Sequence, residues 1–173
     1  IVKPDVFVDL LRREGITFFT GVPDSLLSPL SAHVTAHVAS EAHVIAANEG
    51  QALAIAAGVH LATGGMACVY MQNSGQGNAV NPLCSLCDPE VYGIPVLLVI
   101  GWRGQPGTRD EPQHVKQGRI TLALNAALEV PTIQADAAGT SSDQERGIVE
   151  LIRRGRSESR PVALVVPKGY FEA

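Results

Sequence analysis

The feature that most constrains the fold is a regular alternation of two kinds of segment along the chain. Short runs rich in valine, isoleucine and phenylalanine recur between longer segments whose apolar residues return with helical spacing. This alternation is typical of βα units, in which strands pair in parallel because each returns to the sheet through a helix. The sequence therefore predicts a three-layer α/β/α fold with a six-stranded, mainly parallel sheet.

The boundaries of the predicted elements follow from the same pattern. Strands are expected at residues 17–20, 43–47, 66–72, 94–100, 132–134 and 162–166. Helices are expected at 5–14, 49–63, 78–87, about 112–128 and 142–154. A further helix is expected to begin just after Asp24 or Ser25, either of which could cap it. The 173 residues, 46% of them apolar, suit one buried core rather than two. We therefore expect residues 1–173 to form one domain.

Composition argues against two classes of partner. The net charge is −4, so the basic surface that nucleic acids require is missing. The most apolar stretch, residues 42–62, is interrupted by Asn48, Glu49 and Gln51, which argues against a membrane span. No secretory signal pattern is visible at the first residues. We expect a cytoplasmic protein with local sites for small anions.

The three cysteines do not form an obvious site. Cys84 and Cys87 make a C-x-x-C pair, whereas Cys68 stands alone. A redox pair or half of a zinc site is conceivable, but a zinc site needs four ligands and no second pair lies nearby in the sequence. We interpret the pair as thiols on the inner face of a helix.

Polar residues gather where predicted strands end. The segments Gly21–Ser25, Asn73–Asn78 and Gly101–His114 each follow a strand, and Glu49 follows another. In an open parallel sheet, ligands bind outside the carboxyl ends of the strands. These four segments are therefore expected to meet at one edge of the sheet.

Glu49 is the most informative single residue. It begins a helix that is apolar almost all round and therefore buried. An acid at this position can simply complement the helix dipole. However, an alanine-rich frame also desolvates the carboxyl, and a buried carboxyl that exchanges a proton is a tool for general acid–base chemistry.

The sequence around Glu49 resembles a motif of thiamine-diphosphate enzymes. The matching residues are Ala47-Asn48-Glu49-Gly50-Gln51-Ala52, continuing to Ala56-Ala57-Gly58. In that family the glutamate binds N1′ of the cofactor's aminopyrimidine and so promotes loss of the thiazolium C2 proton. The resemblance implies a thiamine-diphosphate pyrimidine-binding domain, with Glu49 as the activating acid.

Three loops narrow the resemblance to the 2-keto acid decarboxylases of phosphonopyruvate and sulfopyruvate. The loops are Gly21-Val22-Pro23-Asp24-Ser25, Asn73-Ser74-Gly75-Gln76-Gly77-Asn78, and Gly101-Trp102-Arg103-Gly104 followed by Asp110-Glu111-Pro112-Gln113-His114. Gln76 departs from the family, where many members have proline. The resemblance implies decarboxylation of phosphonopyruvate to phosphonoacetaldehyde, with sulfopyruvate as the alternative substrate.

The resemblance also suggests roles for individual residues. Asp24 and His114 match positions used for proton transfer, although a helix N-cap for Asp24 and a solvated loop histidine for His114 are ordinary alternatives. Contacts with the cofactor are expected from Val22, Pro23, Glu49, Asn73, Gly75, Gln76 and Asn78. Binding of the anionic substrate is expected from Ser25, Asn78, Arg103 and Gln113. Among these, Arg103 suits a phosphonate because a guanidinium can bind it bidentately, whereas Arg109, Lys116 and Arg119 are interpreted as solvated charges.

One expected part is missing from the sequence. The family holds the diphosphate through Mg²⁺ at Gly-Asp-Gly followed by Asn-Asn, and neither string occurs. No metal ligand is therefore assigned to this chain. A diphosphate-binding partner is implied, either a β subunit in a hetero-oligomer or a C-terminal domain, with the active site at their interface.

Other readings remain open. A dinucleotide-binding domain would need a third glycine where Val80 stands. A serine hydrolase would need G-x-S-x-G, which does not occur. His33 and His37 have metal-ligand spacing but most simply lie on a solvated helix face. A non-catalytic subunit that keeps the fold for association is the strongest rival.

Overall fold

Six parallel strands form the middle layer of the molecule. The computed structural model describes residues 2–137 and 141–172. The strands stand in the order β2-β1-β3-β4-β6-β5, and every neighbouring pair is parallel. Their bounds are β1 Phe19–Gly21, β2 His43–Ile45, β3 Ala67–Gln72, β4 Val96–Gly101, β5 Thr132–Gln134 and β6 Val162–Val166. The predicted sheet is confirmed.

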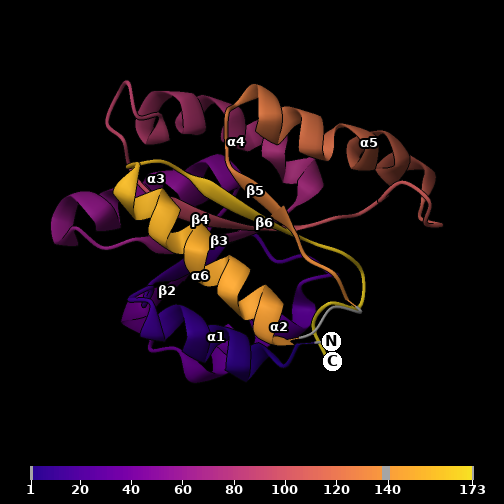
Figure 1. Ribbon diagram of the computed structural model, residues 1–173, viewed down its shortest axis with the longest axis horizontal. Helices are drawn as coiled ribbons and strands as arrows, with labels where there is room; N and C mark the ends of the chain where they lie inside the picture. Colours follow the sequence, from indigo (N-terminus) through magenta and orange to yellow (C-terminus); the bar gives the residue numbers. More distant parts are fainter. Residues whose placement is uncertain (1, 138–140, 173) are drawn as a thin grey trace.

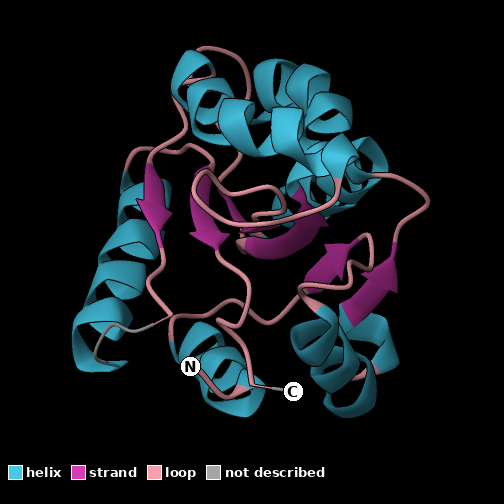
Figure 2. Cartoon of the chain, turned by 90° about the vertical axis from the view of Figure 1, so that its right-hand side faces the viewer, coloured by secondary structure: helices cyan, strands magenta, loops and turns pink. Residues whose placement is uncertain are grey.

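Helices cover both faces of this sheet (Figure 1). One face carries α1 (Pro4–Arg13), α2 (Ser28–His37) and α6 (Ser141–Ser157), and the other carries α3 (Glu49–Thr63), α4 (Gln76–Pro82) and α5 (Pro112–Ala127). Short helical turns complete the chain as η1 (Ser40–Ala42), η2 (Asn73–Gly75) and the π-helix η3 (Leu83–Cys87). Figure 2 shows the strands between the helices from a second direction.

Two apolar clusters, one on each face, hold the layers together. Phe7, Leu30 and Leu164 belong to the cluster beneath α1, α2 and α6. Leu53 and Leu98 belong to the cluster beneath α3 and α4. Strands β3 and β4 contribute to both clusters because successive side chains point to opposite faces, which explains why their sequences are apolar throughout.

The carboxyl edge of the sheet differs from expectation at two helices. Helix α2 begins at Ser28 with Leu27 at the cap position, so neither predicted cap, Asp24 or Ser25, is correct. Pro29 has no N–H to donate to the preceding turn, so it is accommodated only in the first turn of the helix. Likewise Pro82 ends α4, and the chain continues as a π-helix rather than as one α-helix over 78–87.

The interpretation of the C-x-x-C pair was half right. Cys87 is buried in the apolar cluster, and burial raises its pKa to about 12, but Cys84 is exposed. Among the residues described, no group of three or more histidine, cysteine or acidic side chains is arranged to hold a metal ion. None of the helices in the described ranges is long and apolar enough to cross a membrane.

Candidate active site at the carboxyl edge of the sheet

Glu49 is held at the first turn of α3 by contacts that do not use its carboxyl as a cap. Asn48 precedes the helix, and its side-chain oxygen accepts a hydrogen bond from the Gln51 N–H at 2.9 Å. Glu49 is only 9% exposed, and its Oε2 accepts a hydrogen bond from Nδ2 of Asn78 at 2.8 Å. Because Asn48 already caps the helix, the carboxyl of Glu49 is available for another purpose.

Gly75 lies directly against this carboxyl. A Cβ atom built on Gly75 would lie 2.1 Å from Oε1 of Glu49, so only glycine leaves room for the acid at this position. Within the described part of the chain, Oε1 accepts no hydrogen bond from another residue. Glu49, Gly75 and Asn78 thus form one contact cluster from three different elements, with a free carboxyl oxygen.

Asn73 and Gln76 face away from Glu49 and join the loop to α5. Nδ2 of Asn73 donates to the Arg103 carbonyl at 2.8 Å and to Oγ1 of Thr121 at 2.9 Å. Nε2 of Gln76 donates to Oδ1 of Asn125 at 2.7 Å. Both amides are buried. The side chain of Gln76 is therefore committed to α5, and only its backbone remains a predicted cofactor contact.

Asp24 is a buried acid at the end of β1. Its Oδ2 accepts hydrogen bonds from the backbone N–H groups of Leu26 at 3.1 Å and Leu27 at 3.2 Å. Its Oδ1 is buried without a hydrogen-bond partner among the described residues. Burial raises the pKa of Asp24, which those backbone N–H groups and the charge of Arg103 only partly offset. Asp24 therefore closes a turn before α2 instead of capping the helix, and its proton is held more tightly than that of an exposed acid.

Arg103 is locked into an ion pair with Asp110. Its Nε donates to Oδ2 at 2.8 Å and its Nη2 to Oδ1 at 2.5 Å, a bidentate arrangement. Its Nη1 donates to Oγ of Ser25 at 3.1 Å. The hydrogen bonds from Arg103 hold the pKa of Asp110 well below its usual range, and the pKa of Arg103 is raised in return. Arg103 and Ser25, both predicted substrate ligands, are therefore brought together.

Asp110 makes contacts at this edge of the sheet that the sequence did not single out. It also accepts hydrogen bonds from the backbone N–H of Gly104 at 2.7 Å and of Glu111 at 2.8 Å, and so organises the whole loop between β4 and α5. An acid seven residues after an arginine in one long polar loop was the available signal.

The remaining predicted residues are placed at the same edge but are not joined by contacts. Gln113 and His114 lie in the first turn of α5, the former exposed and the latter half-buried. Neither side chain makes a hydrogen bond within the described ranges. Val22 donates its N–H to the Tyr70 carbonyl at 3.1 Å, and Pro23 is exposed. Their proposed roles stay predictions.

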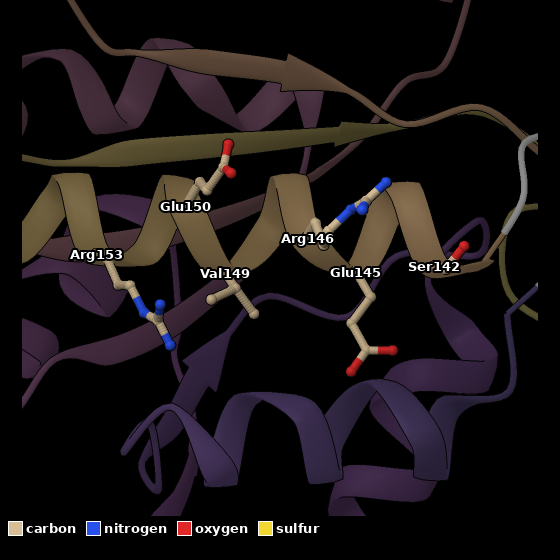
Figure 3. Close-up of a pocket in the computed structure, with 6 residues that line it drawn as sticks. All are labelled: Ser142, Glu145, Arg146, Val149, Glu150 and Arg153. Atoms are coloured by element: carbon tan, nitrogen blue, oxygen red, sulfur yellow. The ribbon is translucent and has the colours of Figure 1, made fainter.

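A separate hollow of about 510 Å³ lies along α6 (Figure 3). Glu145 and Arg153 extend from α6 towards α1, where Glu145 pairs with Arg13 at 2.8 Å and Arg153 with Glu14 at 3.3 Å. These pairs are largely exposed and contribute little to stability. The hollow contains none of the residues that follow the strand ends, and we assign it no chemistry.

Sequence comparisons identify relatives of the chain. Residues 4–125 match the family described as thiamine pyrophosphate enzyme, N-terminal TPP binding domain. The chain is 46% identical over 158 residues to phosphonopyruvate decarboxylase of Streptomyces hygroscopicus, covering 91% of this chain but 38% of that protein. It is 47% identical over 107 residues to the enzyme of the same name from Streptomyces viridochromogenes, covering 62% of this chain and 26% of the relative. The chain thus spans well under half of these relatives.

A shorter relative matches over nearly its whole length. The α subunit of sulfopyruvate decarboxylase from Methanothermobacter thermautotrophicus is 32% identical, and the match covers 93% of both chains. Among solved structures, a thiamine diphosphate-dependent 4-hydroxybenzoylformate decarboxylase of Rhodococcus jostii superposes with a TM-score of 0.70 at 25% identity, covering 98% of this chain and 31% of the other. Benzoylformate decarboxylase from Polynucleobacter necessarius, 18% identical with a TM-score of 0.66, shares the fold.

Proposed function

The chain belongs to the thiamine pyrophosphate enzyme family, as its N-terminal TPP-binding domain, and from this premise we propose that it is the pyrimidine-binding part of a phosphonopyruvate decarboxylase. The observation that carries the proposal is the buried Glu49 carboxyl, which has one oxygen bound to Asn78 and the other free beside Gly75. The names of the two Streptomyces relatives support the choice of substrate.

The residues around Glu49 fit an aminopyrimidine. A flat ring needs an open approach to a carboxyl that can exchange a proton, and Gly75 provides space where any side chain would collide with that carboxyl. When bound, thiamine diphosphate supplies the nucleophilic carbon and the electron sink for loss of CO2. Glu49 would hold or release a proton at its free oxygen, and Asn78 would keep the carboxyl oriented.

The reaction requires one bond to break and one proton to be delivered. The bond between the carboxylate carbon and the keto carbon of phosphonopyruvate breaks, and the carboxylate leaves as CO2. The electron pair of that bond stays with the former keto carbon, where a proton is then added. We propose Asp24 as the donor, because its Oδ1 has no partner among the described residues and burial raises its pKa, so that it holds a proton more tightly than an exposed acid. His114 is the alternative donor.

Sulfopyruvate is the second candidate substrate. The sulfopyruvate decarboxylase α subunit matches this chain over 93% of both lengths, whereas the phosphonopyruvate enzymes are much longer. That match also supports a separate partner subunit. We propose that a diphosphate-binding β subunit or domain supplies the Mg²⁺ site, and that the assembly works in the cytoplasm.

The test is to mix the chain with a candidate diphosphate-binding partner, thiamine diphosphate and Mg²⁺. CO2 release is then compared for phosphonopyruvate, sulfopyruvate and pyruvate. We expect phosphonopyruvate to react fastest. Faster turnover of sulfopyruvate would reassign the substrate, and a stable complex without decarboxylation of any of them would favour the non-catalytic subunit.

Substitution Glu49→Gln tests the residue that carries the proposal. The glutamine can still accept the hydrogen bond from Asn78, so the fold should be retained, but it cannot exchange a proton reversibly. We expect CO2 release to fall by roughly 100-fold or more, with unchanged circular dichroism and thermal unfolding. Near-normal exchange of the cofactor's C2 proton in this variant would contradict the role given to Glu49.

A further inference from the structure

We propose that a cleft beside the candidate active site binds the dianionic phosphonate head of the substrate, with Arg109 and Lys168 as its charged ligands. The identity of the substrate rests on the proposed function. The shape and charge of the cleft are independent of it.

The cleft is built from three strand ends. Ser25 follows β1, the segment from Trp102 to Asp110 follows β4, and Lys168 follows β6. Its volume is about 470 Å³, at the small end of the range of ligand sites. The cleft therefore lies at the edge of the sheet where open parallel folds bind ligands.

The lining of the cleft is positively charged. Three cations, Arg103, Arg109 and Lys168, face one acid, Asp110. Asp110 is already paired with Arg103, so the charge of Arg103 is largely neutralised. Arg109 and Lys168 are exposed, and neither forms an ion pair with any residue in the described ranges. The uncompensated charge of the cleft therefore comes from Arg109 and Lys168, neither of which was predicted to bind substrate.

Arg103 contributes hydrogen bonds more than charge. Its Nε and Nη2 each use an N–H on Asp110, and its Nη1 uses one on Ser25, but a guanidinium carries more N–H groups than these. The ion pair fixes the guanidinium in position, so the remaining N–H groups are preorganised for an oxyanion. Arg103 is thus a fixed donor in a cleft that also contains two exposed cations, Arg109 and Lys168.

A chain of contacts joins the cleft to the Glu49 cluster. The backbone N–H of Arg103, which lines the cleft, donates to Oδ1 of Asn73 at 3.2 Å, and Asn73 begins the turn η2 that ends at Gly75, against the Glu49 carboxyl. We therefore expect a substrate with its phosphonate in the cleft to extend towards Glu49.

The charge of the cleft also implies a selectivity. A phosphonate near neutral pH carries up to two negative charges, whereas a sulfonate carries one. The two unpaired cations, Arg109 and Lys168, attract the dianion more strongly than the monoanion. The remaining N–H groups of Arg103 can bind either head, so they do not reduce this difference in affinity. We therefore expect the cleft to prefer a phosphonate over a sulfonate of the same size.

Binding to the full chain tests this inference without cofactor or partner. Calorimetric titrations with methylphosphonate, methanesulfonate and acetate at low ionic strength, where exposed charges are least screened, give the affinities. We expect methylphosphonate to bind most tightly. Arg109→Ala and Lys168→Ala should each weaken it by about threefold to tenfold, and the double variant should weaken it further. Arg119→Ala and Lys116→Ala, which remove exposed cations of α5 outside the cleft, are the matched controls.

Two results would overturn the inference. Equal weakening by the control variants would show a general effect of net charge, and equal affinity for methanesulfonate and methylphosphonate would remove the selectivity. The outcome is separable from that of the proposed function. Intact methylphosphonate binding together with failed decarboxylation would contradict the proposed reaction and leave the cleft as an oxyanion site.

Discussion

Glu49 differs from an ordinary acid at a helix start because its surroundings are arranged around it. Asn48 performs the capping, Asn78 fixes one carboxyl oxygen, and Gly75 leaves the other uncovered. Asn48 belongs to the same motif as Glu49, whereas Gly75 and Asn78 belong to the segment that follows β3. The chemistry of the acid is therefore a property of the contacts, which can be removed one at a time.

Gly75→Ala should displace the Glu49 carboxyl without changing that residue itself. The new methyl group would lie 2.1 Å from Oε1, so either the carboxyl or the turn η2 must move. We expect a loss of about 1–3 kcal/mol in the free energy of unfolding and loss of decarboxylation in the assembled enzyme. Chemical denaturation and CO2 release measure the two effects.

Gly77→Ala is the matched control for this substitution. It adds the same methyl group two residues later, in α4, where nothing lies within 4 Å of the new atom. Its stability should be unchanged or slightly higher, because alanine favours a helix over glycine by about 0.5–1 kcal/mol. An active Gly75→Ala enzyme would show that the position of the Glu49 carboxyl is not critical.

Asp24 should make stability depend on pH. Its pKa is raised on folding, so the folded chain binds more protons than the unfolded chain, and stability falls as the pH rises above the ordinary value of 3.8 towards the folded pKa. Asp24→Asn removes this loss. The free energy of unfolding of the variant should therefore improve relative to the wild type as the pH rises through that window.

The control for Asp24 is Ser25→Ala, which removes no titratable group. Wild type, Asp24→Asn and Ser25→Ala would be compared by denaturant unfolding in buffers from about pH 3 to about pH 7. This range covers the titration of carboxyl groups. The difference between Ser25→Ala and wild type should not vary with pH. A constant difference for Asp24→Asn as well would contradict the raised pKa.

Among the elements, the loop between β4 and α5 is anchored by the buried Trp102 and is otherwise organised by polar side-chain contacts. The Asp110 carboxylate accepts hydrogen bonds from the Arg103 guanidinium and from the backbone N–H groups of Gly104 and Glu111. Gly104 and Gly118 touch through their backbones, since a Cβ on Gly118 would lie 1.7 Å from the Gly104 oxygen. These contacts pack the loop against α5 and hold Arg103 and Asp110, which line the cleft, in position.

Asp110→Asn should loosen this loop. The substitution removes the charge that holds Arg103, and we expect a cost of about 1–2 kcal/mol with faster hydrogen exchange at the Gly104 amide. Because the pKa of Asp110 is lowered on folding, its contribution is complete above the usual carboxyl range and is lost as the pH falls through its folded value. The variant should therefore lose less stability on acidification than the wild type.

Glu111→Gln is the control for the loop, because Glu111 is exposed and its backbone N–H, not its side chain, contacts Asp110. Exchange at Gly104 should stay at the wild-type rate in this variant. If Asp110→Asn also left that rate unchanged, the loop would be held by backbone packing alone.

In the whole molecule, the two ends of the chain are joined. Val2 donates its N–H to the Tyr170 carbonyl at 2.7 Å, and the N–H of Glu172 donates to the Val2 carbonyl at 3.0 Å. Phe171 packs edge-to-face on Phe7 with ring centroids 5.2 Å apart. Figure 1 shows the termini side by side beneath the sheet. This closure stabilises α1 against the rest of the domain.

Phe171→Ala should destabilise the entire domain. Phe171 is 6% exposed within the cluster that also contains Phe7, so its removal should cost about 3–5 kcal/mol. The denaturation midpoint should fall while the transition stays cooperative. Glu172→Ala, at an exposed neighbour, should change stability by less than about 0.5 kcal/mol. A comparable effect of both substitutions would show that the terminal backbone pairing, not the ring, stabilises the domain.

Much of the fold could be predicted because its elements are defined by local patterns. The bounds of α3, β5 and β6 agree with the sequence-based ranges, and Gly64 ends α3 in the left-handed conformation, which glycine adopts readily. Errors occurred at Pro29 and Pro82, where a missing N–H moved or interrupted a helix. Such errors are local, and the prediction of six parallel strands between two helical layers was unaffected.

The sequence by itself determined the class of fold, the family resemblance and the importance of Glu49, because apolar periodicity and a contiguous motif are local properties of the chain. Only the tertiary structure decided that Gln76 turns to α5, that Asp110 neutralises Arg103, and that Lys168 joins Arg109 beside Ser25. The physical reason is that these relations join residues from different strand ends. Which polar groups pair there depends on the distances and burial that packing creates.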